Sequence, residues 1–524
     1  MKNLFGVGLV LLGCRCLSAA DLYVNQDVGT DRHDGLSARI ESATRGPLKT
    51  IQRAVDLAGA GDTIHLAVIK GDYRQEVQFR DKGGEPGRPI TLDGHGATLS
   101  GAEPCAPGGW VELEGGVWRR KQTLSRNILI VDGEMILETR LAGDLKEGEF
   151  CFETNQWGDA TLFFRPPSGR KAAEFTIETV SAAGEVVRLD PTKWSGGSRP
   201  SYKFKGKPRP AGIRLDGTEA LFPSARASLQ PGHWCMEDGD LYFYPVMNKN
   251  PATLNVQLVV RGTGVSLTGE KGHVAVKNLN VRYVWNDAFN IHGRVIDAQF
   301  FNCNATDCFD EGFSAHDACE TVLDGAVFTR CDNGVFNVNT EGGSVTRNLV
   351  VRDCRHYGFG VAIVESKAKH VLEDAVLAGN GSQLFGRYLK ANNVLILADA
   401  ARADSTGIVA AAPFQLSQAT VSGQGNALRV ERGSGEVRLS GVQFKGPADG
   451  QRVLLETRGK VMLDAVEWSD GTRVRLPKTN ADEGTEIPVT EWSRALSSAD
   501  ASGTLTAAIG CTPELWKLAE KSAP

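Results

Sequence analysis

Four short segments of the chain align without gaps: 288–292 (AFNIH), 312–316 (GFSAH), 335–339 (VFNVN) and 358–362 (GFGVA). Their phenylalanines follow one another at intervals of 24, 23 and 23 residues. Because alternate residues of a strand face opposite sides, the pattern predicts strands with one buried ladder and one outward ladder. The rings expected to stack in the interior are Phe289, Phe313, Phe336 and Phe359.

A second segment type, with branched apolar residues at its start and five positions later, recurs along the same region. Copies begin at Val274, Val295, Val322, Val345, Val371, Val437 and Val461, with weaker copies near Val394 and Leu416. Successive copies lie 21 to 27 residues apart, which is typical of one coil of a solenoid. The chain also holds 60 glycines against 21 prolines, as expected for many short strands and turns. We predict an all-β parallel β-helix, with about nine coils over residues 255–470.

The region before the repeat predicts a helix that covers the open end of the solenoid. Its apolar residues lie on one face at helical spacing: Leu48, Ile51, Ala54, Val55 and Ala58. At the other end, the sequence TPELWKLAEKSA predicts a C-terminal helix with Thr512 as N-cap and Glu514 in its first turn.

The N-terminal region also resembles a known family. The blocks GPLKTIQRAVDLAGAGDTI, GDYR and PITLDGHGATLSG are similar to the N-terminal cap of pectate-lyase-like proteins, which are right-handed parallel β-helices. Polysaccharide lyases, β-helix glycoside hydrolases and uronan epimerases belong to this superfamily. The resemblance covers the cap and the coils from about residue 255 to 470. It implies a right-handed fold and a carbohydrate polymer as partner, without choosing the reaction.

Periodicity and composition divide the chain into five parts. Between about residues 105 and 255 the repeat lapses, and five of the nine tryptophans occur there. This stretch predicts an inserted β-rich module, whose tryptophans either stack on sugars or form its core. The expected parts are a signal peptide (1–20), an N-terminal cap with the first coils (21–104), the inserted module (105–255), the main β-helix (256–470) and a C-terminal cap with a tail helix (471–524).

The first twenty residues predict export. Lys2 precedes an apolar run, and small residues precede Asp21, as in a secretory signal cleaved after Ala20. The sequence LLGC ending at Cys14 also resembles a lipoprotein box, so an N-terminal lipid anchor stays open. We expect a secreted, periplasmic or cell-surface protein without a membrane span. The nine cysteines beyond Cys16 are expected to be mostly unpaired and buried.

The charged residues argue against a nucleic-acid partner and leave a calcium ion possible as a ligand. A net charge of −5, from 58 basic and 63 acidic residues, gives no basic patch that would indicate nucleic acid. Asp27, Asp31 and Asp34 lie in one loop and would suit Ca²⁺, although a hydrogen-bonded turn explains them as well. The sequence does not indicate an oligomeric state.

Polar residues gather on the outward ladder of three coils. They are Asn290, His292, Ser314, His316, Asn337 and Asn339. Long coil intervals flank them, and one of the resulting loops carries Arg355 and Tyr357. Because insertions on a solenoid cluster at its binding face, we expect a site here. Substrate contacts are expected from Asn290, Ser314, Asn337, Asn339, Arg355 and Tyr357.

Acidic residues precede the same strands. Asp287 and Glu311 occupy equivalent places in adjacent coils, and Asp310 stands next to Glu311. Two carboxyl groups that close fit a retaining glycosidase, whereas a pair two coils apart would approach the spacing of an inverting one. The alternative is that these side chains only hydrogen-bond the turn backbone.

His292 and His316 lie in register on the predicted outward face. The segment from Gly312 to Asp317 also resembles the Asp-Pro-His motif of β-helix uronan epimerases, with Ser314 in place of the aspartate. His316 is therefore our candidate base for taking the proton next to a uronate carboxylate. Side chains that could hold that carboxylate are Arg347, Arg352, Arg355 and Lys367.

Three functions follow from these residues. A polysaccharide lyase acting through His316 is slightly favoured over a glycoside hydrolase acting through Asp287 with Asp310 or Glu311. A carbohydrate-binding or surface protein without catalytic activity is the third.

Overall fold

The computed structural model of the 524-residue chain describes most of its length. The described residues are 19–122, 128–137, 147, 150–154, 160–166, 170–180, 185–195, 201–204, 212–216, 218–219, 229–237, 240–362, 367–398, 405–411, 413–423, 425–431, 436–446, 451–456, 460–475, 486–497 and 510–521. The expected signal peptide up to residue 18, with Cys14 and Cys16, lies outside them, and so does Trp157.

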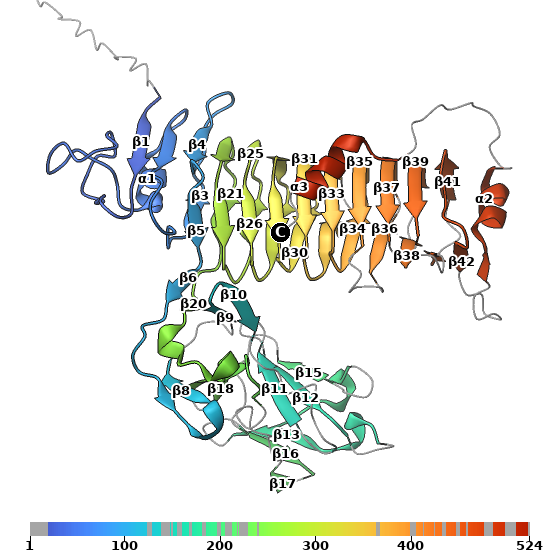
Figure 1. The fold of residues 1–524 in the computed structure, drawn as a ribbon, viewed down its shortest axis with the longest axis horizontal. Helices are drawn as coiled ribbons and strands as arrows, with labels where there is room; N and C mark the ends of the chain where they lie inside the picture. Colours follow the sequence, from blue (N-terminus) through green and yellow to red (C-terminus); the bar gives the residue numbers. More distant parts are fainter. Residues whose placement is uncertain are drawn as a thin grey trace, which may run out of the picture.

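The chain forms a right-handed parallel β-helix with two long parallel sheets along its axis (Figure 1). Sheet A consists, in order, of β1 (Asp21–Val24), β2 (Thr63–Leu66), β4 (Ile90–Asp93), β22 (Val274–Lys277), β25 (Ala298–Phe301), β28 (Glu320–Asp324), β31 (Gly343–Arg352), β33 (Lys369–Ala378), β35 (Leu389–Leu397), β37 (Phe414–Ser422), β39 (Glu436–Lys445) and β41 (Lys460–Asp464).

Sheet B carries the polar residues singled out in the sequence. Its strands are, in order, β3 (Val77–Arg80), β21 (Val265–Gly269), β24 (Phe289–Gly293), β27 (Glu311–Asp317), β30 (Asn333–Asn339), β32 (Tyr357–Val361), β34 (Ser382–Gly386), β36 (Thr406–Ala410), β38 (Asn426–Val430), β40 (Arg452–Leu455), β42 (Arg473–Arg475) and β43 (Glu486–Pro488). All pair in parallel except β43, which is antiparallel to β42.

A short third row of strands, joined to sheet A, turns each early coil. It consists of β5 (Thr98–Ser100), β23 (Asn280–Arg282), β26 (Asn304–Thr306) and β29 (Val327–Thr329). From β31 onward this row merges with sheet A into strands of nine or ten residues. Asn348, Asp374 and Asn393 adopt positive φ inside these strands, which bends each strand where the coil turns.

The interior is a continuous apolar core, but the phenylalanine ladder differs from the prediction at one coil. Phe289 pairs with Phe313, Phe313 pairs with Val335, and Val335 pairs with Phe359. The coil between β27 and β30 has 22 residues, one fewer than the phenylalanine spacing suggests. The prediction that Phe336 lies inside is therefore wrong: a slip of one residue moves every side chain of a strand to its other face, and Phe336 points outward.

Helices close both ends of the solenoid. The expected N-terminal helix is α1 (Ile51–Leu57), which has Thr50 as N-cap. All five of its predicted apolar positions are buried, so that prediction is confirmed. At the far end α2 (Val489–Ser497) inserts Trp492 into the core, and α3 (Pro513–Lys521) packs against β33 and β35 of sheet A (Figure 1). In the described part of the chain, none of the helices has the length and apolar content needed to cross a bilayer.

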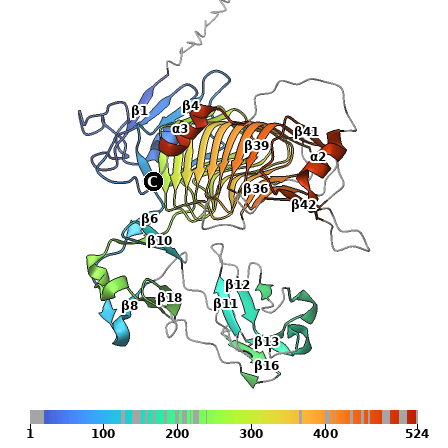
Figure 2. The same ribbon diagram turned by 45° about the vertical axis from the view of Figure 1, so that its right-hand side comes forward.

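Between β5 and β21 the chain leaves the coils and forms small, mainly antiparallel sheets (Figures 1 and 2). These are β10–β9–β20–β6 (Glu134–Leu137, Ile128–Val131, Val256–Val259, Ala102–Pro104), β11–β12–β15 (Phe150–Thr154, Ala160–Phe164, Ser201–Phe204), β14–β13–β16–β17 (Val186–Arg188, Ile177–Val180, Gly212–Leu215, Thr218–Glu219) and β18–β19–β8–β7 (Trp234–Glu237, Asp240–Phe243, Trp118–Lys121, Val111–Glu112). Short 3₁₀ helices in or beside them are Glu114–Gly116, Ala172–Glu174, Pro191–Lys193, Val246–Asn248 and Pro251–Thr253.

The module touches the solenoid at the coils that carry the candidate site. The Tyr283 hydroxyl donates a hydrogen bond to the Gly133 carbonyl at 2.9 Å. Ile128 and Ile130 of β9 share an apolar cluster with Tyr283 and Phe309 of the coils. Within the module Trp234 is fully buried, which fits the interpretation of that residue as core.

The cysteines agree with the sequence analysis. None of the nine described cysteines forms a disulfide, and seven of them are buried. The seven buried cysteines pack inside the coils or the module as small apolar side chains.

Candidate active site

The site is built by residues at the start of the strands of sheet B or just before it. Because Phe289 of β24 pairs with Phe313 of β27, Asp287 and Glu311 stand at the same corner of adjacent coils. In the next coil Asn333 pairs with Glu311, and in the coil after that Tyr357 follows Asn333. Parallel pairing at about 4.8 Å per strand therefore brings these corners into one row.

Three carboxyl groups meet at this row. One oxygen each of Asp287, Asp310 and Glu311 lies within 4.8 Å of the other two. The backbone N–H of Glu311 donates to the Asp287 carboxylate at 3.2 Å, and the Asn333 amide donates to Glu311 at 2.9 Å. Asp287 is buried, with 3% exposed surface, whereas Asp310 and Glu311 are partly exposed. The predicted acids thus form one cluster, and only part of it faces solvent.

Burial and mutual repulsion raise the pKa of all three carboxyl groups. Burial raises the pKa of Asp287 to about 7, against hydrogen bonds from Glu311 and Ser314 that favour its ionised form. Burial raises the pKa of Glu311 to about 9, and its contact with Asp287 adds to the rise. Burial and the charge of Glu311 raise the pKa of Asp310 to about 9. The cluster therefore holds protons at neutral pH and gives up the first of them most readily at Asp287.

A polar chain links the acids to the two histidines. The Ser314 hydroxyl lies 2.6 Å from Nε2 of His316. Since Ser314 donates its one proton to Asp287, His316 donates through Nε2. His316 stacks on His292 with ring centroids 4.1 Å apart and planes 10° apart. Burial and the neighbouring His292 charge lower the pKa of His316 to about 4, so the ring is neutral near pH 7.

The second histidine is held at the outer edge of this chain. Nδ1 of His292 lies 3.6 Å from the Asp317 carboxylate, which also accepts the backbone N–H of Gly293 at 3.0 Å. Burial lowers the pKa of His292, while Asp317 opposes this effect. His292 and His316 therefore point outward, beside the carboxyl cluster, as the sequence suggested.

The next corner holds an ion-pair group. Asp332 contacts Arg355 at 3.0 Å and His356 at 2.9 Å. The Arg355 guanidinium also lies over the ring of Phe309, 5.6 Å from its centroid. Phe309 belongs to the apolar cluster shared with the inserted module, so Arg355 stands between the site and the module. In the described part of the chain, Arg355 and His356 thus pair with Asp332, while the three clustered carboxyl groups contact one another.

Two predicted substrate contacts are wrong. Asn337 and Asn339 have no exposed surface, because the shifted register of β30 turns them into the interior. The Asn337 amide donates to the Ser344 hydroxyl at 3.1 Å, and that hydroxyl lies 2.8 Å from Nδ1 of the buried His370. The Asn339 amide donates to the Cys319 carbonyl at 3.0 Å. Both asparagine side chains therefore form hydrogen bonds inside the solenoid and do not face a substrate on its outer surface.

The remaining predicted contacts lie near the cluster. Asn290 pairs with Ser314 in the neighbouring coil, and its Oδ1 atom is buried without a hydrogen-bond partner among the described residues. Tyr357 is partly exposed one coil beyond Asn333, whose Oδ1 atom accepts its backbone N–H at 3.1 Å. Asn290, Ser314, Tyr357 and Arg355 thus surround the acids on successive coils.

Three cationic candidates lie elsewhere. Arg347 pairs with Glu373 at 2.8 Å on sheet A. Arg352, also on sheet A, donates to the Ala519 carbonyl of α3. Lys367 lies 3.6 Å from Glu341. Of the four residues suggested for holding a substrate carboxylate, Arg355 alone lies beside the acid cluster.

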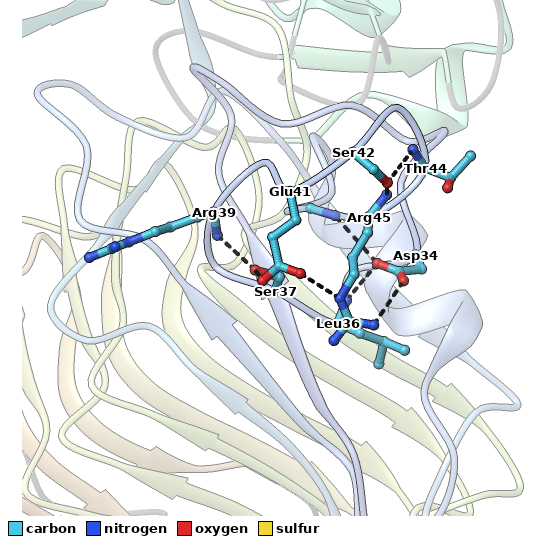
Figure 3. Close-up of polar contacts among 9 residues, drawn as sticks. Asp34, Leu36, Ser37, Arg39, Glu41, Ser42, Thr44 and Arg45 are labelled. Atoms are coloured by element: carbon cyan, nitrogen blue, oxygen red, sulfur yellow. Dashed lines mark hydrogen bonds and ion pairs between the residues drawn. The ribbon is translucent and has the colours of Figure 1, made fainter.

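In the loop suggested to bind calcium, Asp31 and Asp34 accept hydrogen bonds from backbone N–H groups of the protein. Asp31 accepts the backbone N–H groups of Lys49 and Thr50 at 3.0 and 2.9 Å. Asp34 accepts the Leu36 N–H at 3.0 Å and lies 3.8 Å from Arg45 (Figure 3). The hydrogen-bonded turn therefore accounts for these aspartates. Among the described residues, the acids that gather closely enough for a metal ion are those of the Asp287 cluster.

Sequence reasoning missed Asp332, Asn333 and the outward rings of Phe336 and Phe385. Asp332 and Asn333 form the dipeptide that takes, one coil later, the place of Asp310 and Glu311. Aligning the residues before each strand would have found them. Phe336 was missed because Val335 beside it is also apolar, and either residue could fill the interior position.

Comparison with known proteins gives remote structural likenesses. No family model matches the chain, and no curated protein matches it. A structure of XylC in complex with xylose has 12% identity and a TM-score of 0.48, covering 82% of this chain and 70% of XylC. A structure described as a glycoside hydrolase has 13% identity and a TM-score of 0.48, covering 87% of this chain and 96% of its own. The catalytic domain of a GH87 α-1,3-glucanase with tetrasaccharides has 9% identity and a TM-score of 0.26, covering 71% and 92%.

Proposed function

We propose that the protein is an exported carbohydrate-active enzyme that hydrolyses glycosidic bonds with Asp287 and Glu311. The observation that carries this proposal is their placement at equivalent corners of adjacent coils, with carboxyl oxygens within 4.8 Å. Glycosidases that retain anomeric configuration hold their carboxyl groups about 5 to 5.5 Å apart, whereas inverting enzymes need about 6.5 to 9.5 Å to admit a water molecule. Oxygens that lie within 4.8 Å of each other leave no room for a water molecule between the two groups, which favours retention.

The two carboxyl groups differ in the way that such a reaction requires. Glu311, with a pKa of about 9, keeps its proton at neutral pH and can give it to the leaving oxygen. Asp287, with a pKa of about 7, ionises first because Glu311 N–H and Ser314 donate to it. Its carboxylate forms the bond to the anomeric carbon as the glycosidic bond breaks. Glu311 then takes a proton from water, and the hydroxide released attacks the anomeric carbon and frees the sugar.

A lyase acting through His316 is the second candidate. Its supporting observation is a ring that is neutral near pH 7 and partly exposed, as a general base must be. Against it stands the pairing of the neighbouring cation, Arg355, with Asp332. A uronate would have to approach the cluster of Asp287, Asp310 and Glu311, and Arg355 is already paired with Asp332. Hydrolysis of an uncharged sugar needs no such cation.

A substrate screen tests both candidates. The purified protein is incubated with a panel of neutral and uronic polysaccharides, and reducing ends are followed beside the ultraviolet absorbance of unsaturated ends. We expect reducing ends without unsaturated ends, and loss of this activity in Glu311→Gln and Asp287→Asn. Glu373→Gln, which removes a paired carboxylate on sheet A, is the matched control. Unsaturated ends, or full activity in both site variants, would contradict the proposal.

A further inference from the structure

An aromatic row runs along the outer surface of sheet B, starting beside the carboxyl cluster. Phe336 stacks on Tyr357 with centroids 5.4 Å apart and planes 21° apart. Tyr357 in turn lies 5.4 Å from Phe385, with an interplanar angle of 32°. All three rings are partly exposed, although apolar rings gain most from full burial. We call Phe336, Tyr357 and Phe385 the aromatic row.

The aromatic row continues the candidate site along the helix axis. Phe336 is the pairing partner of Ser314, which hydrogen-bonds Asp287. Tyr357 stands one coil beyond Asn333 at the equivalent position, and the Asn333 amide donates to Glu311. Phe385 pairs with Gly360, one coil farther from the acids. Measured along the helix axis at about 4.8 Å per coil, the row runs from about 5 Å to about 14 Å beyond Glu311.

The backbone makes room for these rings. Gly360 pairs with Phe336 and lies under its ring, where a Cβ atom would overlap the ring carbons. Any other residue at this position would push Phe336 off the surface of the sheet. Gly360 therefore gives Phe336 the space it needs. The strands that carry the row follow directly after β27, which holds Glu311.

We propose that the substrate is a neutral polysaccharide whose chain lies along the helix axis, with sugar units beyond the cleavage point packed on the aromatic row. This inference rests on the proposed function. Aromatic rings bury the apolar faces of sugars and leave their hydroxyl groups free to hydrogen-bond. The site favours a neutral chain, because Asp287 in its ionised form would repel a uronate and Arg355, the cation beside the cluster, is already paired with Asp332.

The length of the row also bears on the kind of substrate. A single sugar at the carboxyl groups would leave Tyr357 and Phe385 without a contact, since they stand two and three coils away. Each added unit on that side buries more ring surface, so affinity should rise with chain length. A polymer uses the whole row, whereas a disaccharide uses only its near end.

Binding without turnover tests this inference. The background is Glu311→Gln, which is expected to be catalytically silent, and the probes are xylo-, cello- and laminari-oligosaccharides of two to six units beside oligogalacturonates of equal length. Calorimetry should show affinity rising at least tenfold from two to six units in one neutral series. Adding Tyr357→Ala or Phe385→Ala should lower hexamer affinity at least tenfold, and the loss should grow with chain length.

The control is Trp516→Ala, which removes an exposed aromatic ring of α3 that lies beside Lys445 of sheet A. It should bind the hexamer like the background, and thermal unfolding should show all variants folded. Tighter binding of oligogalacturonates, no binding of any neutral series, or unchanged affinity in both aromatic variants would overturn the inference. Because no bond is cleaved in this assay, such a result leaves the hydrolysis test to decide the proposed function separately.

Discussion

The backbone N–H of Glu311 donates a hydrogen bond to the carboxylate of Asp287 at 3.2 Å, across two adjacent coils. This contact favours the ionised form of Asp287, while burial keeps the Glu311 side chain protonated. A parallel β-helix produces the arrangement directly, because equivalent corners of successive coils lie one strand spacing apart. The pair consequently has different protonation states at neutral pH.

Activity should follow a bell-shaped pH profile. The proposed reaction needs Asp287 ionised, which holds above its pKa of about 7, and Glu311 protonated, which holds below its pKa of about 9. We expect kcat/KM to be highest between these values and to fall on both sides. Initial rates from pH 4 to 11 provide the measurement. A maximum near pH 5 would show that the cluster titrates in a different order.

Glu311→Gln should stabilise the fold increasingly as the pH rises. The unfolded carboxyl group loses its proton near 4.5, but the folded one keeps it to about 9. Between these values the folded state binds more protons, so the stability of the native protein falls with rising pH by at most about 1.4 kcal/mol per pH unit for this group. Glutamine removes that loss. Denaturant unfolding at pH 4 and pH 8 should show a gain only at pH 8, and equal gains would refute the explanation.

Two phenylalanines of neighbouring coils should differ sharply in their contribution to stability. Phe313 is fully buried and packs edge-on against Phe300 at 5.1 Å, so Phe313→Ala should cost about 3 to 5 kcal/mol. Phe336 lies on the surface, and Phe336→Ala should cost less than about 2 kcal/mol. Equilibrium unfolding of both variants checks the register of β30. Equal losses would place Phe336 inside, contrary to the structure.

His316→Ala should separate the two candidate reactions. In a hydrolase this histidine orients Ser314 toward Asp287 and touches no reacting atom, so its removal should lower kcat less than Glu311→Gln does. In a lyase it is the base, and its loss should cost about 10² to 10⁴-fold. Comparing kcat for the two variants on the same substrate gives the answer. A larger loss at His316 would favour elimination.

The fold was predictable from the sequence because coil length and strand alternation leave periodic traces. The five-residue segments around Phe289, Phe313 and Phe359 fall on sheet B in the expected register. The exception at Phe336 has a physical cause. Val335 and Phe336 are both apolar, so the pattern could not show that this coil has 22 residues, and the asparagines after them were assigned to the wrong face.

The site was predictable in part. Asp287 and Glu311 could be matched by counting residues, since equivalent positions of a solenoid become neighbours. The raised pKa values could not be predicted, because they depend on how deeply each carboxyl group is buried. The aromatic row as a whole also escaped prediction, although Tyr357 was a predicted contact. Phe336 and Phe385 both pair with Gly360, but Tyr357 stands three residues before that glycine, so strand register alone does not show that the three rings stack.

The anomeric configuration of the first product tests the central claim most directly. On the neutral polysaccharide that the screen identifies, proton NMR of the reaction in its first minutes distinguishes the newly released anomer before mutarotation mixes the two forms. If Asp287 and Glu311 act as a pair with oxygens within 4.8 Å of each other, the product keeps the configuration of the bond that was cleaved. Release of the opposite anomer would contradict the account, and so would an unsaturated product.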